Sequence, residues 1–230
     1  MDNLQLTIEL GSGVALGYRW INGEGIVARL ALIDAVGREF DDYVARMDDS
    51  GPIDLREEGI IETGLDYTDG IAHASVSQLD TDRTVETTLY SSYDKVRAHS
   101  VRSNRPRSKI PIGGGQFKSR MIDIIYQPAR RCTFYFRGDR ERLEQLFEKH
   151  FTDLGKKTSA GFGRVQDWGF RTIDADYSVI HPTEDVAMRP IPVEQLDWSA
   201  DTETLTYKTP YHYRRWAREC APPGVKVSGW

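Results

Sequence analysis

The stretch CTFYFRGDRERLEQLFEKH, residues 132–150, joins a strand pattern to a helix pattern. Apolar and polar side chains alternate over Cys132–Arg137, which predicts a β-strand with one buried face. Asp139 stands where the N-cap of a helix is expected, so we expect a helix over about residues 140–152. Its packed face is expected to hold the apolar and aromatic residues at helical spacing: Leu143, Leu146, Phe147 and His150.

The same patterns extend outward from this stretch. Leu4–Leu10 alternates and ends at Gly11-Ser12-Gly13, which predicts a strand. A helix is expected over about residues 23–36, with Asn22 as its N-cap and Gly37 at its end. Arg164–Thr172 is expected to form the last strand of the series.

The middle of the chain predicts further pairs of strands. Met121–Tyr126 and Cys132–Arg137 are expected to pair around Pro128. Ile71–Leu79 and Thr84–Tyr93 are expected to form a hairpin through residues 80–83. A short helix is expected around residues 40–47, within a region that is acidic and contains several glycines.

The resulting order is strand, helix, strands, helix, strand. This order is typical of a ferredoxin-like (RRM-like) α+β sandwich, an antiparallel sheet with two helices on one face, over residues 1–173. Residues 174–230 show little periodic pattern. We expect an irregular extension there, packed on its own domain or on a neighbouring subunit.

Composition limits the class of protein. Hydrophobic residues make up 39% of the 230 residues, which is enough for a packed core. No run is long and apolar enough for a membrane span, and the first residues lack the pattern of a secretory signal. Two cysteines exclude a disulfide framework and an all-cysteine zinc site. We therefore expect a soluble cytoplasmic protein without a cofactor or metal.

Charge is unevenly distributed along the chain. The net charge is -5, which by itself argues against a nucleic-acid partner. Residues 1–93, however, carry 6 basic and 18 acidic side chains, whereas residues 94–173 carry 18 basic and 8 acidic ones. Such asymmetry points to a polyanionic partner for the basic part.

The segment from Gly155 to Arg164 is the most informative motif. Glycines allow the backbone to approach an anion closely, and the lysines and hydroxyls add donors. The segment is neither a Walker loop nor a dinucleotide fingerprint, and an ordinary helix end followed by a turn would also contain a glycine. We expect phosphate contacts from this glycine loop through Lys156, Lys157, Ser159, Gly161, Phe162, Gly163 and Arg164.

A second basic segment covers about residues 94–120. It mixes cations, glycines and an aromatic residue, which suits single-stranded RNA, although a solvated surface loop has the same composition. The residues expected to bind RNA are Arg102, Arg105, Arg107, Lys109, Gly113, Gly114, Gly115, Phe117, Lys118 and Arg120.

Catalytic motifs are sparse. His73 and His99 flank the expected hairpin, and either could act as a general base in RNA cleavage. His181 and His212 lack the spacing of metal ligands, and paired-carboxylate or nucleophile motifs do not occur. Catalysis is therefore the weaker alternative.

These motifs resemble a known family. The glycine loop is similar to the C-terminal glycine-rich loop of the RAMP superfamily, the RNA-binding ferredoxin-like proteins of CRISPR effector complexes. Ile112–Met121, Trp168, Tyr177-Ser178 and Ala187–Pro192 resemble the type IV subunit that caps the 5′ end of the crRNA. This subunit is the counterpart of the five-prime-handle-binding subunit of type I systems. The resemblance covers about residues 105–192 and, more weakly, residues 1–37.

The resemblance implies a non-catalytic subunit that grips the 5′ handle of the crRNA. The basic segment would be a thumb-like insertion, and Arg189 would join the RNA-binding residues. The implied partners are crRNA, the backbone subunits of the filament, a large or small capping subunit and, through the assembled complex, target DNA. Some type I relatives cleave precursor crRNA, so a metal-independent endoribonuclease is the alternative function.

Overall fold

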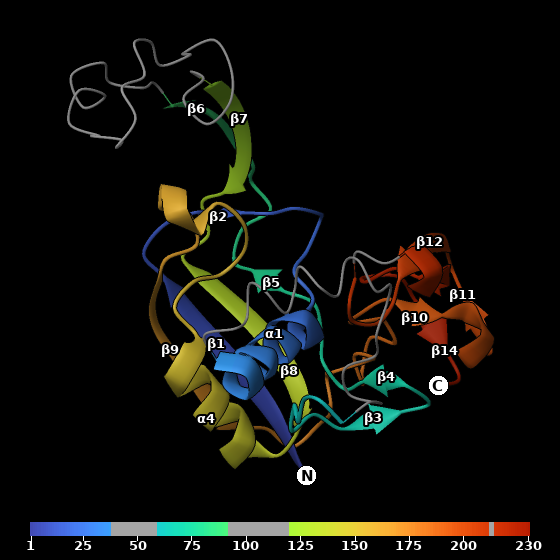
Figure 1. Cartoon of the computed structure of the whole chain (residues 1–230). Helices are drawn as coiled ribbons and strands as arrows, with labels where there is room; N and C mark the ends of the chain where they lie inside the picture. Colours follow the sequence, from blue (N-terminus) through green and yellow to red (C-terminus); the bar gives the residue numbers. More distant parts are fainter. Residues whose placement is uncertain (38–58, 92–119, 212–213) are drawn as a thin grey trace, which may run out of the picture.

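The structure is a computed structural model that describes residues 1–37, 59–91, 120–211 and 214–230. It is an α+β protein whose sheets are mostly antiparallel (Figure 1). The expected helix at 40–47 and most of the basic segment lie outside the described residues. No helix among the described residues has both the length and the apolar character needed to cross a membrane.

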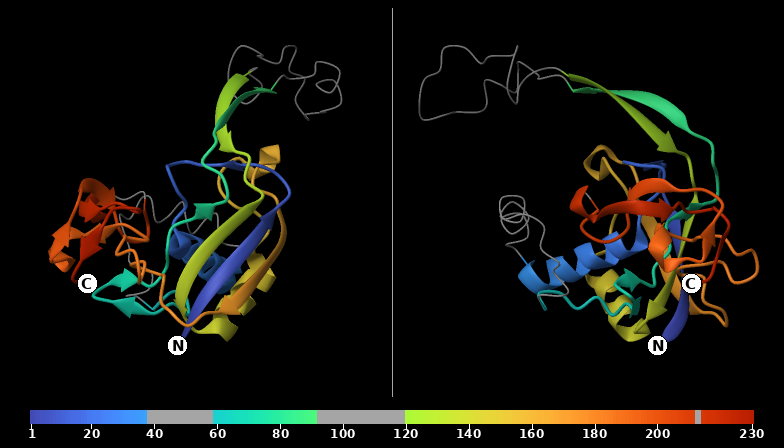
Figure 2. Two further views of the ribbon diagram at one scale, coloured as in Figure 1. Left: turned by 180° about the vertical axis from the view of Figure 1, so that it is seen from behind. Right: turned by 90° about the vertical axis from the view of Figure 1, so that its right-hand side faces the viewer.

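A four-stranded antiparallel sheet organises the larger part of the molecule. Its strand order is β5-β8-β1-β9. Helices α1 and α4 lie together on one face of this sheet (Figure 2). The elements are β1 (Asp2–Leu10), α1 (Gly23–Val36), β5 (Gln78–Leu79), β8 (Arg131–Gly138), α4 (Arg140–His150) and β9 (Val165–Thr172).

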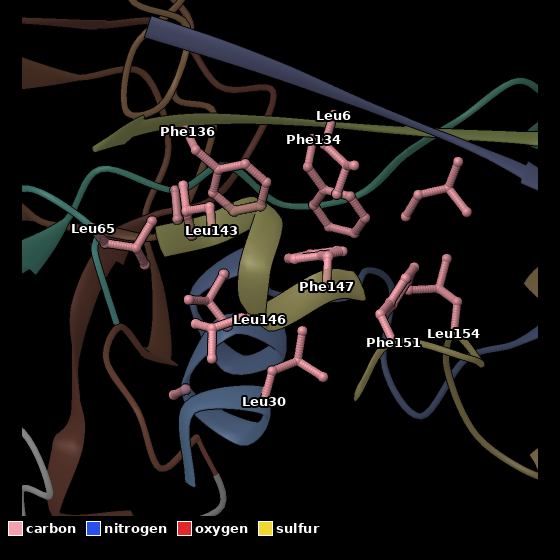
Figure 3. Close-up of a cluster of buried hydrophobic side chains, with 14 of the residues drawn as sticks. Leu6, Leu30, Leu65, Phe134, Phe136, Leu143, Leu146, Phe147, Phe151 and Leu154 are labelled. Atoms are coloured by element: carbon pink, nitrogen blue, oxygen red, sulfur yellow. The ribbon is translucent and has the colours of Figure 1, made fainter. Parts of the chain in front are cut away.

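The main core lies between the sheet and the two helices. The alternating residues Leu6 of β1 and Phe134 and Phe136 of β8 point toward the helices (Figure 3). Leu146 and Phe147 of α4 meet them and are fully buried. Burial of one face of each strand therefore explains the period-2 pattern of the sequence.

The two helices begin in different ways. The Asp139 side chain caps α4 as expected, because its Oδ1 accepts hydrogen bonds from the backbone N–H groups of Glu141 and Arg142 at 3.0 and 3.2 Å. Asn22 occupies the N-cap position of α1, but its side chain makes no capping hydrogen bond. Asn22 is therefore the N-cap residue as expected, and the neighbouring Gly23 N–H donates to Ser75 O at 3.0 Å.

The expected strand pairs are wrong, although most of the strands exist. β6 (Val85–Ser91) pairs along its whole length with β7 (Arg120–Gln127), and β2 (Val14–Ala15) pairs with the other edge of β7. β8 cannot pair with β7 because β1 and β5 occupy both its edges. β6 and β7 form an arm that runs away from the body (Figure 1).

The segment after β3 (Tyr67–Thr68) and β4 (Ile71–Ala72) explains the failure of the other hairpin. Residues 71–76 are all buried. Ser75 N donates to Tyr135 O and Val76 N donates to Met188 O, each at 2.8 Å. This segment is therefore fixed between two parts of the protein and cannot fold back on β6.

Residues 174–230 form a small β unit, so the expectation of an irregular extension is wrong. A three-stranded sheet and a two-stranded sheet enclose a second core around Val179, Ile191 and Val227. Strands this short do not produce a recognisable period. They are β10 (Ile191–Pro192), β11 (Trp198–Ser199), β12 (Glu203–Thr206), β13 (Ala217–Ala221) and β14 (Val227–Ser228).

A buried ion pair joins this β unit to α1. Arg189 is 1% exposed and Glu24 is 5% exposed, and Arg189 Nη2 donates to Glu24 Oε2 at 3.0 Å. The guanidinium also donates to the carbonyls of Ala72 and Tyr207. The Tyr211 hydroxyl donates to the same Glu24 oxygen at 2.7 Å, and burial raises the pKa of that hydroxyl well above its usual value.

Asp34 near the end of α1 holds α4. It accepts from Arg142 Nη1 at 3.0 Å, His150 Nε2 at 3.1 Å and Lys149 Nζ at 3.3 Å. The hydrogen bond from His150 is the largest cause that lowers the pKa of Asp34 to about 2. His150 is therefore half-buried at the edge of the interface between the helices rather than in the core.

We predict that Arg189→Met destabilises the protein by about 3–5 kcal/mol, because Glu24 would remain buried without its cation. Urea unfolding measures this loss. The double variant Glu24→Gln/Arg189→Met removes both charges and should be the more stable of the two variants. A double variant as unstable as Arg189→Met would contradict the role of the ion pair.

We also predict an acid-sensitive contribution from Asp34. Its folded pKa lies below the ordinary value of 3.8, so its contribution is present above pH 3.8 and is lost as pH falls toward about 2. In urea unfolding at a series of acidic pH values, Asp34→Asn should lose less stability over this window than the wild type. The control Asp82→Asn, at an exposed position, should follow the wild type. Equal losses in all three proteins would count against this role.

Candidate nucleic-acid interface

The glycine loop, residues 155–164, connects α4 to β9 and is shaped by a close backbone approach. Gly163 is buried at φ 64°, and a Cβ there would overlap the carbonyl oxygen of Leu154. Leu154 N donates to Gly163 O at 2.8 Å, which closes the loop on itself. Only glycine fits this position, because both the backbone angle and the space exclude a side chain.

Backbone hydrogen bonds hold the glycine loop against residues 11–15. Lys156 N donates to Ala15 O, Gly163 N to Gly13 O and Gly11 N to Arg164 O, each at 2.8 Å. Arg164 N donates to the Ser12 hydroxyl at 3.0 Å. The loop is thus attached to the end of β1 and to β2, and its backbone is ordered before any ligand binds.

The cations of the glycine loop point outward. Lys156, Lys157, Ser159 and Arg164 are exposed. Within the part of the chain that the structure describes, Lys156, Lys157 and Arg164 form no ion pair. The three cations therefore stand exposed on one loop whose backbone is held by hydrogen bonds, and none of them is in an ion pair with the described residues.

Phe162 and Gly161 differ in their surroundings. The Phe162 ring packs against Tyr126 of β7 with ring centroids 5.2 Å apart, which attaches the glycine loop to the root of the arm. Gly161 is exposed with open space around its Cα. The Phe162 ring is half-buried, and Tyr126 covers part of it.

Arg120 lies at the far end of β7 and is exposed. Gln127, at the root of the arm, is seven residue steps further along β7, a distance of roughly 23 Å. It therefore stands well apart from the glycine loop. The other cations, glycines and Phe117 expected in the basic segment, residues 102–118, lie outside the described residues.

The assignment of Arg189 to RNA binding is wrong. Its side chain is inside the protein and donates to Glu24 and two carbonyls. The sequence around Arg189, which resembles the RAMP family over Ala187–Pro192, gave no sign that this side chain is buried. Its acidic partner Glu24 lies 165 residues away in the sequence.

His73 is not accessible to RNA. It is 1% exposed, and Nε2 is 2.8 Å from the Thr68 hydroxyl. Its Nδ1 is 3.1 Å from both Asp176 Oδ2 and the Ser178 hydroxyl. Although burial raises the pKa of Asp176, hydrogen bonds from His73 and Ser178 outweigh it and lower the pKa to about 2. His73 therefore links the β3–β4 hairpin to the β unit. His99, the other residue expected to act as a general base, lies outside the described residues, as does His212.

An aromatic–cation cluster beside the glycine loop was missed. The Arg19 guanidinium lies 5.3 Å from the Tyr18 ring centroid and 4.8 Å from that of Trp20, and it also pairs with Glu203 of β12. The triplet Tyr18-Arg19-Trp20 is a recognisable signal for stacking on a base, because bases stack on aromatic and guanidinium planes. Its position next to the glycine loop could not be deduced from sequence.

Among the residues that the structure describes, no group of three or more histidine, cysteine, aspartate or glutamate side chains could hold a metal ion. Neither the comparison with protein-family models nor that with curated proteins finds a significant match for the chain. Function is therefore inferred from the residues and their geometry.

We predict that Gly163→Ala destabilises the protein by about 2–4 kcal/mol, since the methyl group would overlap Leu154 O at a positive φ. The matched control is Gly161→Ala, which has a positive φ but open space and should lose only about 1–2 kcal/mol. Equal losses in urea unfolding would show that the close approach at Gly163 is not a constraint.

Proposed function

We propose that this protein is a ferredoxin-like RAMP subunit of a type IV CRISPR ribonucleoprotein complex. In this proposal it binds the 5′ handle of the crRNA, caps the backbone filament and is not an enzyme. The single observation that carries RNA binding is the set of exposed cations on the glycine loop, which form no ion pair with the described residues. The complex it belongs to rests on the family resemblance.

The arrangement of the main sheet supports the ferredoxin-like assignment. Taken in chain order, its elements are β1, α1, β5, β8, α4 and β9, and the spatial order is β5-β8-β1-β9. This is the βαββαβ arrangement with both helices on one face. Because this fold has many functions, it is compatible with RNA binding without requiring it.

The chemistry of the glycine loop supports a phosphate ligand. An arginine fork and two ammonium groups on a preorganised backbone can neutralise adjacent phosphates. The loop needs little ordering when it binds, so less entropy is lost. The net charge of the whole chain does not oppose this binding, because the electrostatic interaction with a polyanion is local.

The arm supports the proposed thumb. β6 ends at Ser91 and β7 begins at Arg120, so both ends of the basic segment are attached at the tip of the arm (Figure 2). Tyr90, Met121 and Ile125 lie on one face of the arm and are 61–73% exposed. We propose that this arm contacts guide RNA or neighbouring subunits of a cytoplasmic complex, which would include backbone subunits, a capping subunit and bound target DNA.

We predict that Lys156→Ala/Lys157→Ala weakens binding of crRNA about 5- to 30-fold. The plot of log affinity against log salt should flatten by about 1.4, since two phosphate contacts would be lost. Fluorescence anisotropy with labelled crRNA at several salt concentrations measures both quantities.

The matched control is Arg83→Ala/Lys226→Ala, which also removes two exposed cations but lies outside the glycine loop. It should leave affinity close to that of the wild type. If the two double variants lost affinity and salt dependence equally, the glycine loop would not be the phosphate site.

A further inference from the structure

A cavity of about 770 Å³ opens beside the glycine loop. Its walls come from residues 17–22, the first turns of α1, residues 150–158 and β12 with Tyr211. Pockets that bind small ligands measure roughly 300–1,000 Å³, so the space is sufficient for one nucleotide. Gly155, Lys156 and Thr158 belong both to the glycine loop and to this cavity.

The inner wall of the cavity is apolar. Leu30, Phe151, Leu154 and Leu205 are buried side chains that line it. They come from α1, the segment that follows α4, and β12, so the surface exists only because the β unit packs beside the sheet unit. An apolar wall of this kind is suited to the face of a planar base.

Aromatic rings add to the lining. Tyr18 is 52% exposed and Trp20 is half-buried, and both residues line the cavity. Their ring centroids are 5.0 Å apart in an edge-to-face arrangement. Exposed aromatic rings are the usual stacking surfaces for unpaired bases.

Lys156 supplies a positive charge at the edge of the cavity. Asp153 and His150 also belong to the lining, and His150 is bonded to Asp34. The Lys156 side chain crosses Gly17 so closely that a Cβ on Gly17 would collide with Lys156 Cε and Nζ. Its ammonium group is therefore positioned where the glycine loop and the cavity meet.

We propose that this cavity binds one nucleotide of an RNA strand held by the glycine loop, with the base inside and a phosphate at Lys156. The inference rests on the proposed RNA-binding function and adds a base site to the phosphate site. An acidic peptide fits less well, because it would make little use of the aromatic rings.

The experiment compares two threonine-to-tryptophan variants of the full chain. Thr204 is an exposed residue of β12 that lines the cavity, so Thr204→Trp fills the space. Thr183 is exposed and lies outside the cavity, so Thr183→Trp is the matched control. The probe is labelled single-stranded RNA of mixed sequence, about eight nucleotides long, titrated at several salt concentrations.

Thr204→Trp should weaken RNA binding about tenfold, the loss expected when one stacked base is excluded. Its salt dependence should stay that of the wild type, because no phosphate contact is removed. Thr183→Trp should bind like the wild type. Lys156→Ala/Lys157→Ala should differ from Thr204→Trp in having a flatter salt dependence.

The outcomes separate the two proposals. Failure of the wild type to bind RNA would overturn the proposed function and the occupant of the cavity with it. Wild-type affinity in Thr204→Trp, together with a flattened salt dependence in the lysine variant, would overturn the cavity proposal alone. If Thr204→Trp does not fold, Trp20→Ala decides in the same way: weaker binding with unchanged salt dependence supports the proposal, and wild-type binding overturns it.

Two competitors identify other occupants. A mixture of ribonucleoside monophosphates that binds the wild type but not Thr204→Trp, while RNA affinity is equal in both, would assign the cavity to a free nucleotide. The same result with a polyglutamate peptide would assign it to an acidic protein segment. Either result would overturn the proposed RNA nucleotide.

Discussion

The buried contact between Arg189 and Glu24 determines how the two parts of this molecule fit together. Glu24 is in the first turn of α1, and Arg189 enters from the β unit. Neither charge is favourable in the interior alone, so each requires the other. Tyr211, whose hydroxyl also donates to Glu24, is one of the residues that line the cavity. The relative position of the two units, and with it the shape of the cavity, therefore depends on this contact.

A second constraint arises where the backbone of Gly163 approaches Leu154. It brings the glycine loop back against residues 11–15, which in turn pair with the root of the arm. The Tyr126 ring is in contact with Phe162 on this side. The glycine loop and the arm are thus connected through residues 11–15. The two segments that are expected to bind RNA, although distant in the sequence, are therefore held in a fixed relation at the root of the arm.

The positions of the charged side chains in the fold matter more than the net charge of the chain. The acidic total of -5 hides three exposed cations on the glycine loop, none of them in an ion pair with a residue that the structure describes. Elsewhere, carboxylates are used inside the protein: Asp34 fixes α4, Asp176 fixes His73 and Glu24 fixes Arg189. Part of the acidity is therefore structural, which leaves the cations of the loop available to a polyanion.

Local sequence determined β1, α1, β8, α4 and β9, because one buried face repeats along each element, and the Asp139 cap followed from its own neighbours. It also predicted that Lys156, Lys157 and Arg164 belong to a phosphate site, since glycines and cations are visible along the chain. Strand partners, the short strands of the β unit, the burial of Arg189 and the cavity beside Trp20 were decided only by tertiary structure. The physical reason is that pairing and burial depend on which distant surfaces meet, and a periodic pattern shows that a face is buried without showing what covers it.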